Sequence, residues 1–374
     1  MLKSFTVSNF KAFAEPITID FSATGNYEFN KEAVKDGIVK TGVMYGKNAS
    51  GKSSLGLAIF DIVGTLTDNF FNQQKYDNFA NRFSQDGFID FKYVFSFDGK
   101  DIIYSYKKSR FSELYSEELT INNKLLIKYN RSEDKTKIVI NMKGAENVNL
   151  NLNQLHFSIL RFIKSNVILA QNEENELFEK FYQFVNKMLM FWSLQTQGFI
   201  GYTPITNQSI IDNIIKQGHF DDLQKFFKEA GFEDELTHKQ INGNEQLLIS
   251  YGKNNDISFE DASSSGMKSL LHFYYWLEDI ADESKCPSFI FIDEFDAFYH
   301  YELSYFIIEK LKSYNCQVLL TTHNTSIFTN DLLRPDCYYI CSKNKIENAH
   351  NATLKELRFG HNLEKLYRGG TFGK

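Results

Sequence analysis

The sequence predicts an α/β fold with buried parallel strands, an antiparallel β-lobe and a short helical insertion. Three observations predict it. A glycine-rich loop, Gly46 to Ser53, lies between an apolar run and a helical segment. Two later apolar runs, 289–292 and 317–320, end in polar residues, as buried parallel strands do. Residues 88–143 alternate apolar and polar side chains, which indicates antiparallel hairpins.

The glycine-rich loop fits the pattern G-x-x-x-x-G-K-[ST] of phosphate-binding loops. Two glycines let the loop wrap so that backbone N–H groups and the next helix's N-terminus point at phosphates. A nucleoside triphosphate is therefore expected, with Lys52 on its β and γ phosphates and Ser53 on Mg²⁺. No guanine-reading Asn-Lys-x-Asp motif follows, which favours adenine. The expected binding residues are Gly46, Lys47, Asn48, Ala49, Ser50, Gly51, Lys52, Ser53 and Ser54.

The two later apolar runs carry the remaining chemistry at their ends. Phe289–Ile292 leads into Asp293-Glu294, so two carboxylates are expected at the sheet edge where ligands bind. Asp293 is expected to support Mg²⁺, and Glu294 to polarise the attacking water. The second run leads into Thr321-Thr322-His323-Asn324, at the end of the expected neighbouring strand. His323 is then a candidate contact of the γ-phosphate.

A serine-rich segment, 263–267, precedes the apolar-periodic run from Leu270 to Ile280. Serines and a glycine ahead of a helix form an anion-receiving N-terminus. A turn that only caps the helix has the same composition, so both interpretations stay open.

The order of these motifs resembles that of the ABC-type ATPase head, a P-loop NTPase. Ser263–Met267 aligns with the signature Leu-Ser-Gly-Gly-Gln, keeping the serine at the second position and the last glycine and departing at the other three. Such departures are typical of the SMC- and RecF-like branch. The opening Leu2–Phe21, with its Asn9-Phe10 step, is similar to that branch's first strand pair. The closing 362–373 resembles AAA-labelled ATPases of bacterial anti-phage and abortive-infection systems, of the RloA and AbiL type. OLD-family nucleases have a similar head.

The resemblance implies ATP hydrolysis in a site completed by a second copy of the chain. Lys52, Glu294 and His323 would be catalytic, with Ser264, Ser265 and Gly266 acting in trans. A head-to-tail homodimer, or a higher homo-oligomer, is expected. Gln171 would be the glutamine that contacts Mg²⁺, although an exposed loop amide is the simpler interpretation and Gln154 is the alternative.

The expected domain division is an ATPase head over 1–171 and 251–374, with its β-lobe at about 88–143, and a helical insertion over 172–250. The insertion shows no sustained heptads, which excludes the long coiled coil of true SMC proteins. The residues after His323 are too few for a Toprim nuclease domain. A separate effector protein, a nuclease or toxin, is therefore expected.

Composition limits the partners. The net charge of −6 argues against a generally DNA-attracting surface, although a local basic patch leaves nucleic acid possible. No apolar run is long enough to span a membrane and no signal-peptide core is present, so a cytoplasmic protein is expected. The resemblance implies an ATP-driven sensor or regulator of anti-phage defence. The alternatives are a RecF-like DNA-maintenance ATPase and a nucleotide-gated scaffold with slow turnover.

Overall fold

The fold is taken from a computed structural model of the chain. The structure describes residues 1–67, 69, 79–83, 87–131, 138–148, 157–191, 199–202, 210–241, 243–252, 255–281, 285–297 and 299–372. Gln154, the alternative metal-contacting glutamine, lies outside these residues.

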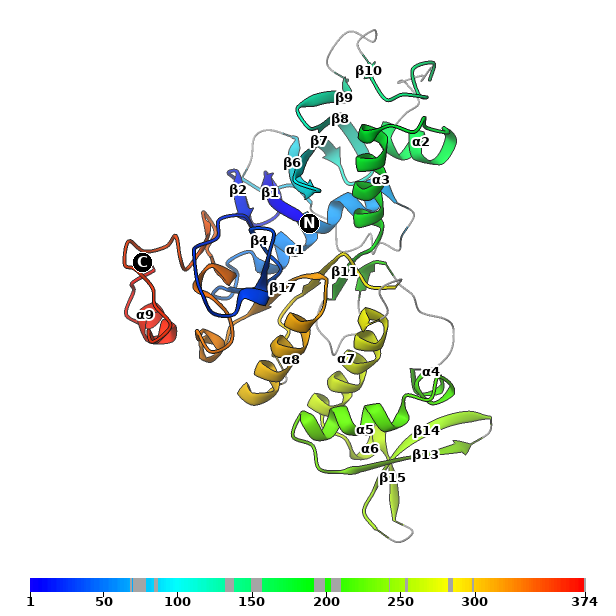
Figure 1. Cartoon of the computed structure of the whole chain (residues 1–374), viewed down its shortest axis with the longest axis vertical. Helices are drawn as coiled ribbons and strands as arrows, with labels where there is room; N and C mark the ends of the chain where they lie inside the picture. Colours follow the sequence, from blue (N-terminus) through cyan, green and yellow to red (C-terminus); the bar gives the residue numbers. More distant parts are fainter. Residues whose placement is uncertain are drawn as a thin grey trace.

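A mostly parallel sheet forms the centre of the molecule (Figure 1). Among the described residues it has seven strands in the order β12-β11-β16-β17-β5-β18-β19. The inner five are parallel, and the edge strands β12 and β19 are antiparallel. The strands span, in that order, Phe199–Gly201, Met188–Phe191, Phe289–Ile292, Gln317–Thr322, Thr41–Tyr45, Tyr338–Cys341 and Ile346–Asn348. The pairing of β16 with β17 confirms the predicted neighbours, and both strands are wholly buried, which explains their continuous apolar runs.

The predicted β-lobe is a second, antiparallel sheet in the order β10-β9-β8-β7-β6-β1-β2. The opening segment forms the predicted strand pair, β1 with β2, and this pair extends the sheet beyond the predicted bounds of 88–143. Asp98 and Gly99 both have positive φ (53° and 73°) in the β6–β7 turn, the geometry that a two-residue hairpin requires. The strands span Val139–Ile140, Lys124–Asn130, Glu113–Ile121, Lys100–Arg110, Ile89–Phe97, Leu2–Ser8 and Ile17–Asp20.

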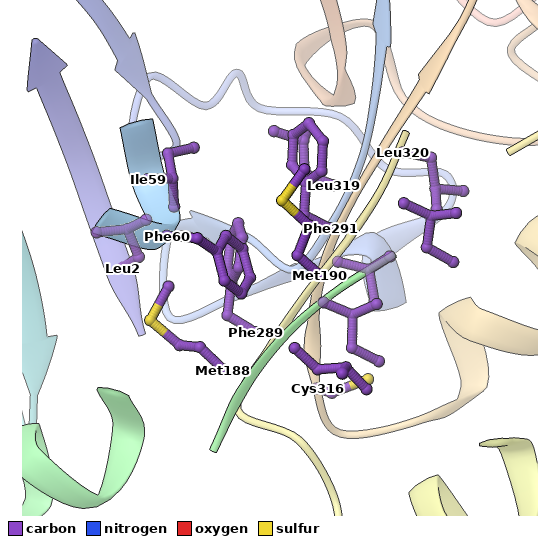
Figure 2. Packing of buried hydrophobic residues seen from close by; sticks show 14 of the residues in the cluster. Leu2, Ile59, Phe60, Met188, Met190, Phe289, Phe291, Cys316, Leu319 and Leu320 are labelled. Carbon is purple, nitrogen blue, oxygen red and sulfur yellow. The ribbon is translucent and has the colours of Figure 1, made fainter. Parts of the chain in front are cut away.

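Helix α1 (Lys52–Leu66) follows the glycine-rich loop and lies between the two sheets. Gly56 faces β16 so closely that a Cβ there would be 2.5 Å from Cε1 of Phe291. On the β-lobe side, the Tyr93 hydroxyl donates to the carbonyl of Ala58 at 2.9 Å. Figure 2 shows side chains of α1 and β16 meeting in this core, with Phe60 beside Phe289.

Polar side chains buried in this layered core join α1 and the central sheet to the β-lobe. Lys108 Nζ of β7 lies 2.7 Å from Asp61 Oδ2 of α1, with 4% and 0% of the two side chains exposed. The Gln317 amide of β17 exchanges two hydrogen bonds of 2.9 Å with the backbone of Leu2. The Lys108–Asp61 ion pair and the Gln317 amide thus fix the orientation of the β-lobe relative to α1 and the central sheet.

A lower lobe contains α4 to α7 and the three-stranded sheet β13-β14-β15 (Figure 1). The helices span Ile210–Lys216, Phe220–Glu229, Phe259–Ala262 and Ser265–Ala281, and the strands span Glu235–Ile241, Asn244–Ser250 and Asp256–Ser258. Helix α8 (Tyr301–Ser313) lies between β16 and β17 in the chain, and α2 (Ile159–Asn166) and α3 (Glu173–Asn186) lie beside the β-lobe.

The segment 172–250 is less helical than its pattern indicated. Helix α3 ends at Asn186, and the buried Met188–Phe191, within the segment expected to be helical, forms strand β11, parallel to β16. A run of four apolar residues fits a buried helix and a buried strand equally well, so periodicity could not separate them. Because β11 belongs to the central sheet, this segment is not purely an insertion by topology, and the domain division stays a prediction.

Short elements complete the chain. The closing segment returns to the central sheet, since the Tyr367 ring of α9 (Leu363–Arg368) lies 4.7 Å from that of Tyr45 in β5. Arg368 of α9 donates to Thr325, two residues beyond His323, at 3.1 Å. The short strands β3 and β4 are Val34–Lys35 and Ile38–Val39, the 3₁₀ turns are Lys31–Ala33, Thr325–Ile327 and Pro335–Cys337, and α9 is Leu363–Arg368.

Candidate nucleotide-binding site

The glycine-rich loop joins β5 to the N-terminus of α1, as a phosphate-binding loop requires. Gly51 has φ of 107°, and a Cβ there would also lie 2.6 Å from the ring of Phe13. At Gly46, a Cβ would be 2.5 Å from Ser50 Oγ and 2.9 Å from the carbonyl oxygen of Cys341. Both glycines of the motif are therefore required by this loop geometry.

Lys52 is the buried cation of this loop. Its Nζ donates to the carbonyl of Gly46 at 2.7 Å and lies 3.1 Å from Nε2 of His323. Burial lowers the pKa of the Lys52 ammonium below its ordinary value, while Asp293 and Glu294 act in the opposite direction. The side chain is 5% exposed, so a phosphate bound here would meet a poorly solvated charge.

Asp293 and Glu294 follow β16 at the same sheet edge. Asp293 is buried and accepts hydrogen bonds from Ser53 and from Thr321, the latter at 2.7 Å. Burial raises the pKa of the Asp293 carboxyl above its ordinary value, and these hydrogen bonds oppose the shift. Glu294 is half-exposed and has φ of 48°, a left-handed conformation that is rare outside glycine and asparagine.

His323, at the end of β17, lies between the other functional groups. Its Nε2 is 3.3 Å from Oε1 of Glu294, and the ring is also the neighbour of Lys52. An open pocket of about 510 Å³ is lined by residues 48–54 together with Ala12, Glu294 and His323. Residues from the loop, from β16 and from β17 thus meet around one cavity.

The structure does not bring every predicted residue to this pocket. Ser264, Ser265 and Gly266 are at the start of α7 and do not line it. Ser264 is exposed, and its hydroxyl accepts from the Met267 N–H at 3.2 Å, which is helix capping. Gln171 is exposed in the turn before α3 and is also absent from the lining.

Three neighbouring side chains were not assigned a role from the sequence. Thr321 holds Asp293 and Glu294, and Thr322 donates to Asp296 at 2.7 Å. Burial raises the pKa of the Asp296 carboxyl above its ordinary value. The sequence signal was available, because Asp296 is a third acid two residues after Glu294 and both threonines directly precede the histidine.

The chain resembles known proteins in family and in fold. A family described as "AAA domain, putative AbiEii toxin, Type IV TA system" matches residues 43–329. The SMC head bound to the C-winged helix domain of ScpA covers 92% of this chain and 96% of its own, at 13% identity and a TM-score of 0.51. The SMC head domain from Thermotoga maritima has 16% identity, covers 93% and 98%, and has a TM-score of 0.45. RecF with ATPrS has 15% identity, the same coverages, and a TM-score of 0.42. No curated protein matches.

The fold is that of an SMC-type ATPase head, and its first central strand leads into a loop with the phosphate-binding pattern. Within that class, the chain belongs to the AAA-domain family with the AbiEii description, whose match runs from β5 to beyond His323. Among the described residues, no helix is long and apolar enough to cross a membrane.

Proposed function

We propose that the chain binds ATP with Mg²⁺ at the glycine-rich loop, hydrolyses it, and so regulates a separate toxic effector, a nuclease, in bacterial anti-phage defence. The observation that carries the enzymatic part is the meeting of Lys52, Glu294 and His323 around one pocket. They come from three different elements, which a structural ion pair does not require. Phosphoryl transfer needs this kind of convergent positioning and charge more than covalent help.

Each of the three groups has a distinct proposed role. Lys52 is positioned to neutralise the β and γ phosphates. Glu294, half-exposed at the rim, is positioned to orient the attacking water. His323, beside both, is positioned to contact the γ-phosphate and to report its presence to the loop after β17.

The residues around Ser53 and Asp293 fit Mg²⁺. A hydroxyl and a buried carboxylate already hydrogen-bond to each other beside the loop, and both are hard oxygen ligands. The described residues contain no group of three or more His, Cys, Asp or Glu that could cage a metal ion. Mg²⁺ in nucleotide sites keeps few protein ligands and is completed by phosphates and water. When bound, it supplies charge neutralisation on the phosphates. We retain Gln171 as the proposed glutamine that links the β-lobe to this metal.

The proposed assembly is a head-to-tail homodimer. Ser264 and Ser265 are exposed at the N-terminus of α7, in the lower lobe, while the pocket lies at the start of α1 (Figure 1). A serine-bearing helix N-terminus that is accessible and separate from its own pocket is suited to a phosphate held by a second copy. Gly266 is buried at the same helix start.

A second candidate function follows from the family description, which names a toxin. In that case this chain would itself be the toxic component, without a separate effector. The RecF-like alternative, an ATPase of DNA maintenance, shares the enzymatic part and differs in its partner. All three place the protein in the cytoplasm.

One set of strains separates these candidates. The chain alone, its native operon, and the operon with Lys52→Ala are compared for growth and for phage plaque number. We expect the chain alone to be harmless, the operon to lower plaque number, and Lys52→Ala to abolish that protection. Toxicity of the chain alone favours the toxin candidate. Unchanged plaque number combined with sensitivity to DNA damage on deletion favours DNA maintenance.

The purified chain is not expected to cut DNA or RNA with Mg²⁺ or Mn²⁺, because Asp293-Glu294 is assigned to ATP. Its release of phosphate from ATP tests the enzymatic part directly. Metal-dependent nucleic acid cleavage that survives Lys52→Ala would replace the proposed separate nuclease with one in this chain.

A further inference from the structure

We propose that Thr321 is a positioning residue for ATP hydrolysis, whose hydroxyl holds Asp293 and Glu294 in their working arrangement. This inference rests on the proposed function. Thr321 comes from the end of β17, one strand away from the carboxylates, and has no accessible surface. It cannot touch a nucleotide, so its effect must pass through the residues that it contacts.

The Thr321 hydroxyl makes two hydrogen bonds of opposite direction. It accepts from the backbone N–H of Glu294 at 2.8 Å and donates to Oδ1 of Asp293 at 2.7 Å. The backbone carbonyl of Thr321 also accepts from the N–H of Phe295 at 3.1 Å. One residue of β17 therefore fixes three consecutive residues at the end of β16.

Glu294 needs such a support because of its backbone conformation. Its φ of 48° is left-handed, which is strained for a residue with a long side chain. A strained residue keeps its conformation only where its surroundings determine it, and here the N–H of the strained residue is the group that Thr321 holds. The same conformation directs the carboxylate to 3.3 Å from His323.

The bond to Asp293 has a separate consequence for the metal site. With Oδ1 accepting from Thr321, the carboxylate keeps a fixed rotation while it accepts from Ser53. Loss of the hydroxyl would remove one of the hydrogen bonds that orient Asp293 and the bond that holds the N–H of Glu294. Thr322 supports the next turn in the same way through Asp296, so the two threonines clamp the segment that follows β16.

The test compares Thr321→Val with Thr321→Ser. Valine keeps the β-branch and the volume but makes neither hydrogen bond, whereas serine keeps the hydroxyl. Thr41→Val is a matched control, because Thr41 is equally buried on the adjacent β5 and its hydroxyl has no hydrogen-bond partner in the described structure. Each variant is assayed for ATP affinity with a fluorescent ATP analogue, for kcat by phosphate release, and for thermal unfolding.

We expect Thr321→Val to lower kcat about 100-fold, the usual scale for a misplaced catalytic group, with ATP affinity little changed. Thr321→Ser and Thr41→Val should both stay near the wild-type kcat. This split between kcat and affinity is not expected from general destabilisation. If Thr321→Val does not fold, Thr321→Ala is compared with Thr321→Ser in the same way.

Two failures are distinguishable. If wild-type protein releases phosphate and Thr321→Val or its alanine substitute does so at the same kcat, Thr321 has no positioning role and the proposed function stands. If folded wild-type protein neither binds nor hydrolyses ATP, the proposed function fails, and this inference fails with it.

Discussion

Replacement of Lys52 by alanine removes the buried cation from the pocket. Two unit charges about 3 Å apart attract each other by about 5.5 kcal/mol at an effective dielectric constant of about 20. Desolvation of the partners offsets part of this attraction, and loss of one such transition-state contact typically costs about 2.7–4 kcal/mol, or 10²–10³ in rate. We therefore expect kcat/KM for ATP to fall by at least about 100-fold. The rate of phosphate release at saturating and at limiting ATP measures kcat and kcat/KM.

The fold should survive this change. Lys52 hydrogen-bonds to a carbonyl of its own loop and to His323, and its burial already disfavours the charge. Thermal unfolding should therefore differ little from wild type. Lys92→Ala, on the exposed face of the β-lobe, controls for the loss of any lysine. Undiminished hydrolysis by well-folded Lys52→Ala would refute the assignment of the site.

Three further predictions follow from the same contacts. Glu294→Gln should keep ATP bound but slow its cleavage, so that a dimer accumulates on size exclusion with ATP; a monomeric, fully active variant would contradict this. Ser264→Arg should block the dimer and the ATPase while costing only about 1 kcal/mol of stability through the lost helix cap; wild-type activity that stays linear on dilution would argue against the trans site. Lys108→Met should lower the free energy of unfolding by about 3–5 kcal/mol in denaturant titration, because the buried carboxylate of Asp61 would lose its counter-charge. An unchanged midpoint would show that the ion pair contributes nothing to stability.

Residues at the ends of strands could be placed from the sequence because parallel strands have their carboxyl ends at one edge. That rule brought Asp293, Glu294 and His323 to the loop of Lys52, and the structure has them there. It depends only on the order of apolar runs and on their direction, both of which are visible in a sequence.

Features that depend on tertiary contacts were not visible. The left-handed Glu294 and its bond to Thr321 arise between strands, and no local pattern encodes them. Strand β11 was missed because four buried apolar residues have no diagnostic period. The serines of α7 were assigned by their order in the chain, and their role in the pocket of a second copy stays a prediction.

Because α1 lies between the two sheets, it connects the nucleotide pocket physically to the β-lobe. Its first residue is Lys52, while Asp61, further along the same helix, is tied to Lys108 of the β-lobe. A helix is stiff along its axis, so a displacement imposed at its phosphate-binding end must carry the lobe with it or break a buried ion pair. The position of the outer strands of the lobe would then depend on whether ATP is bound. A partner protein bound to those strands would respond to ATP without contacting it.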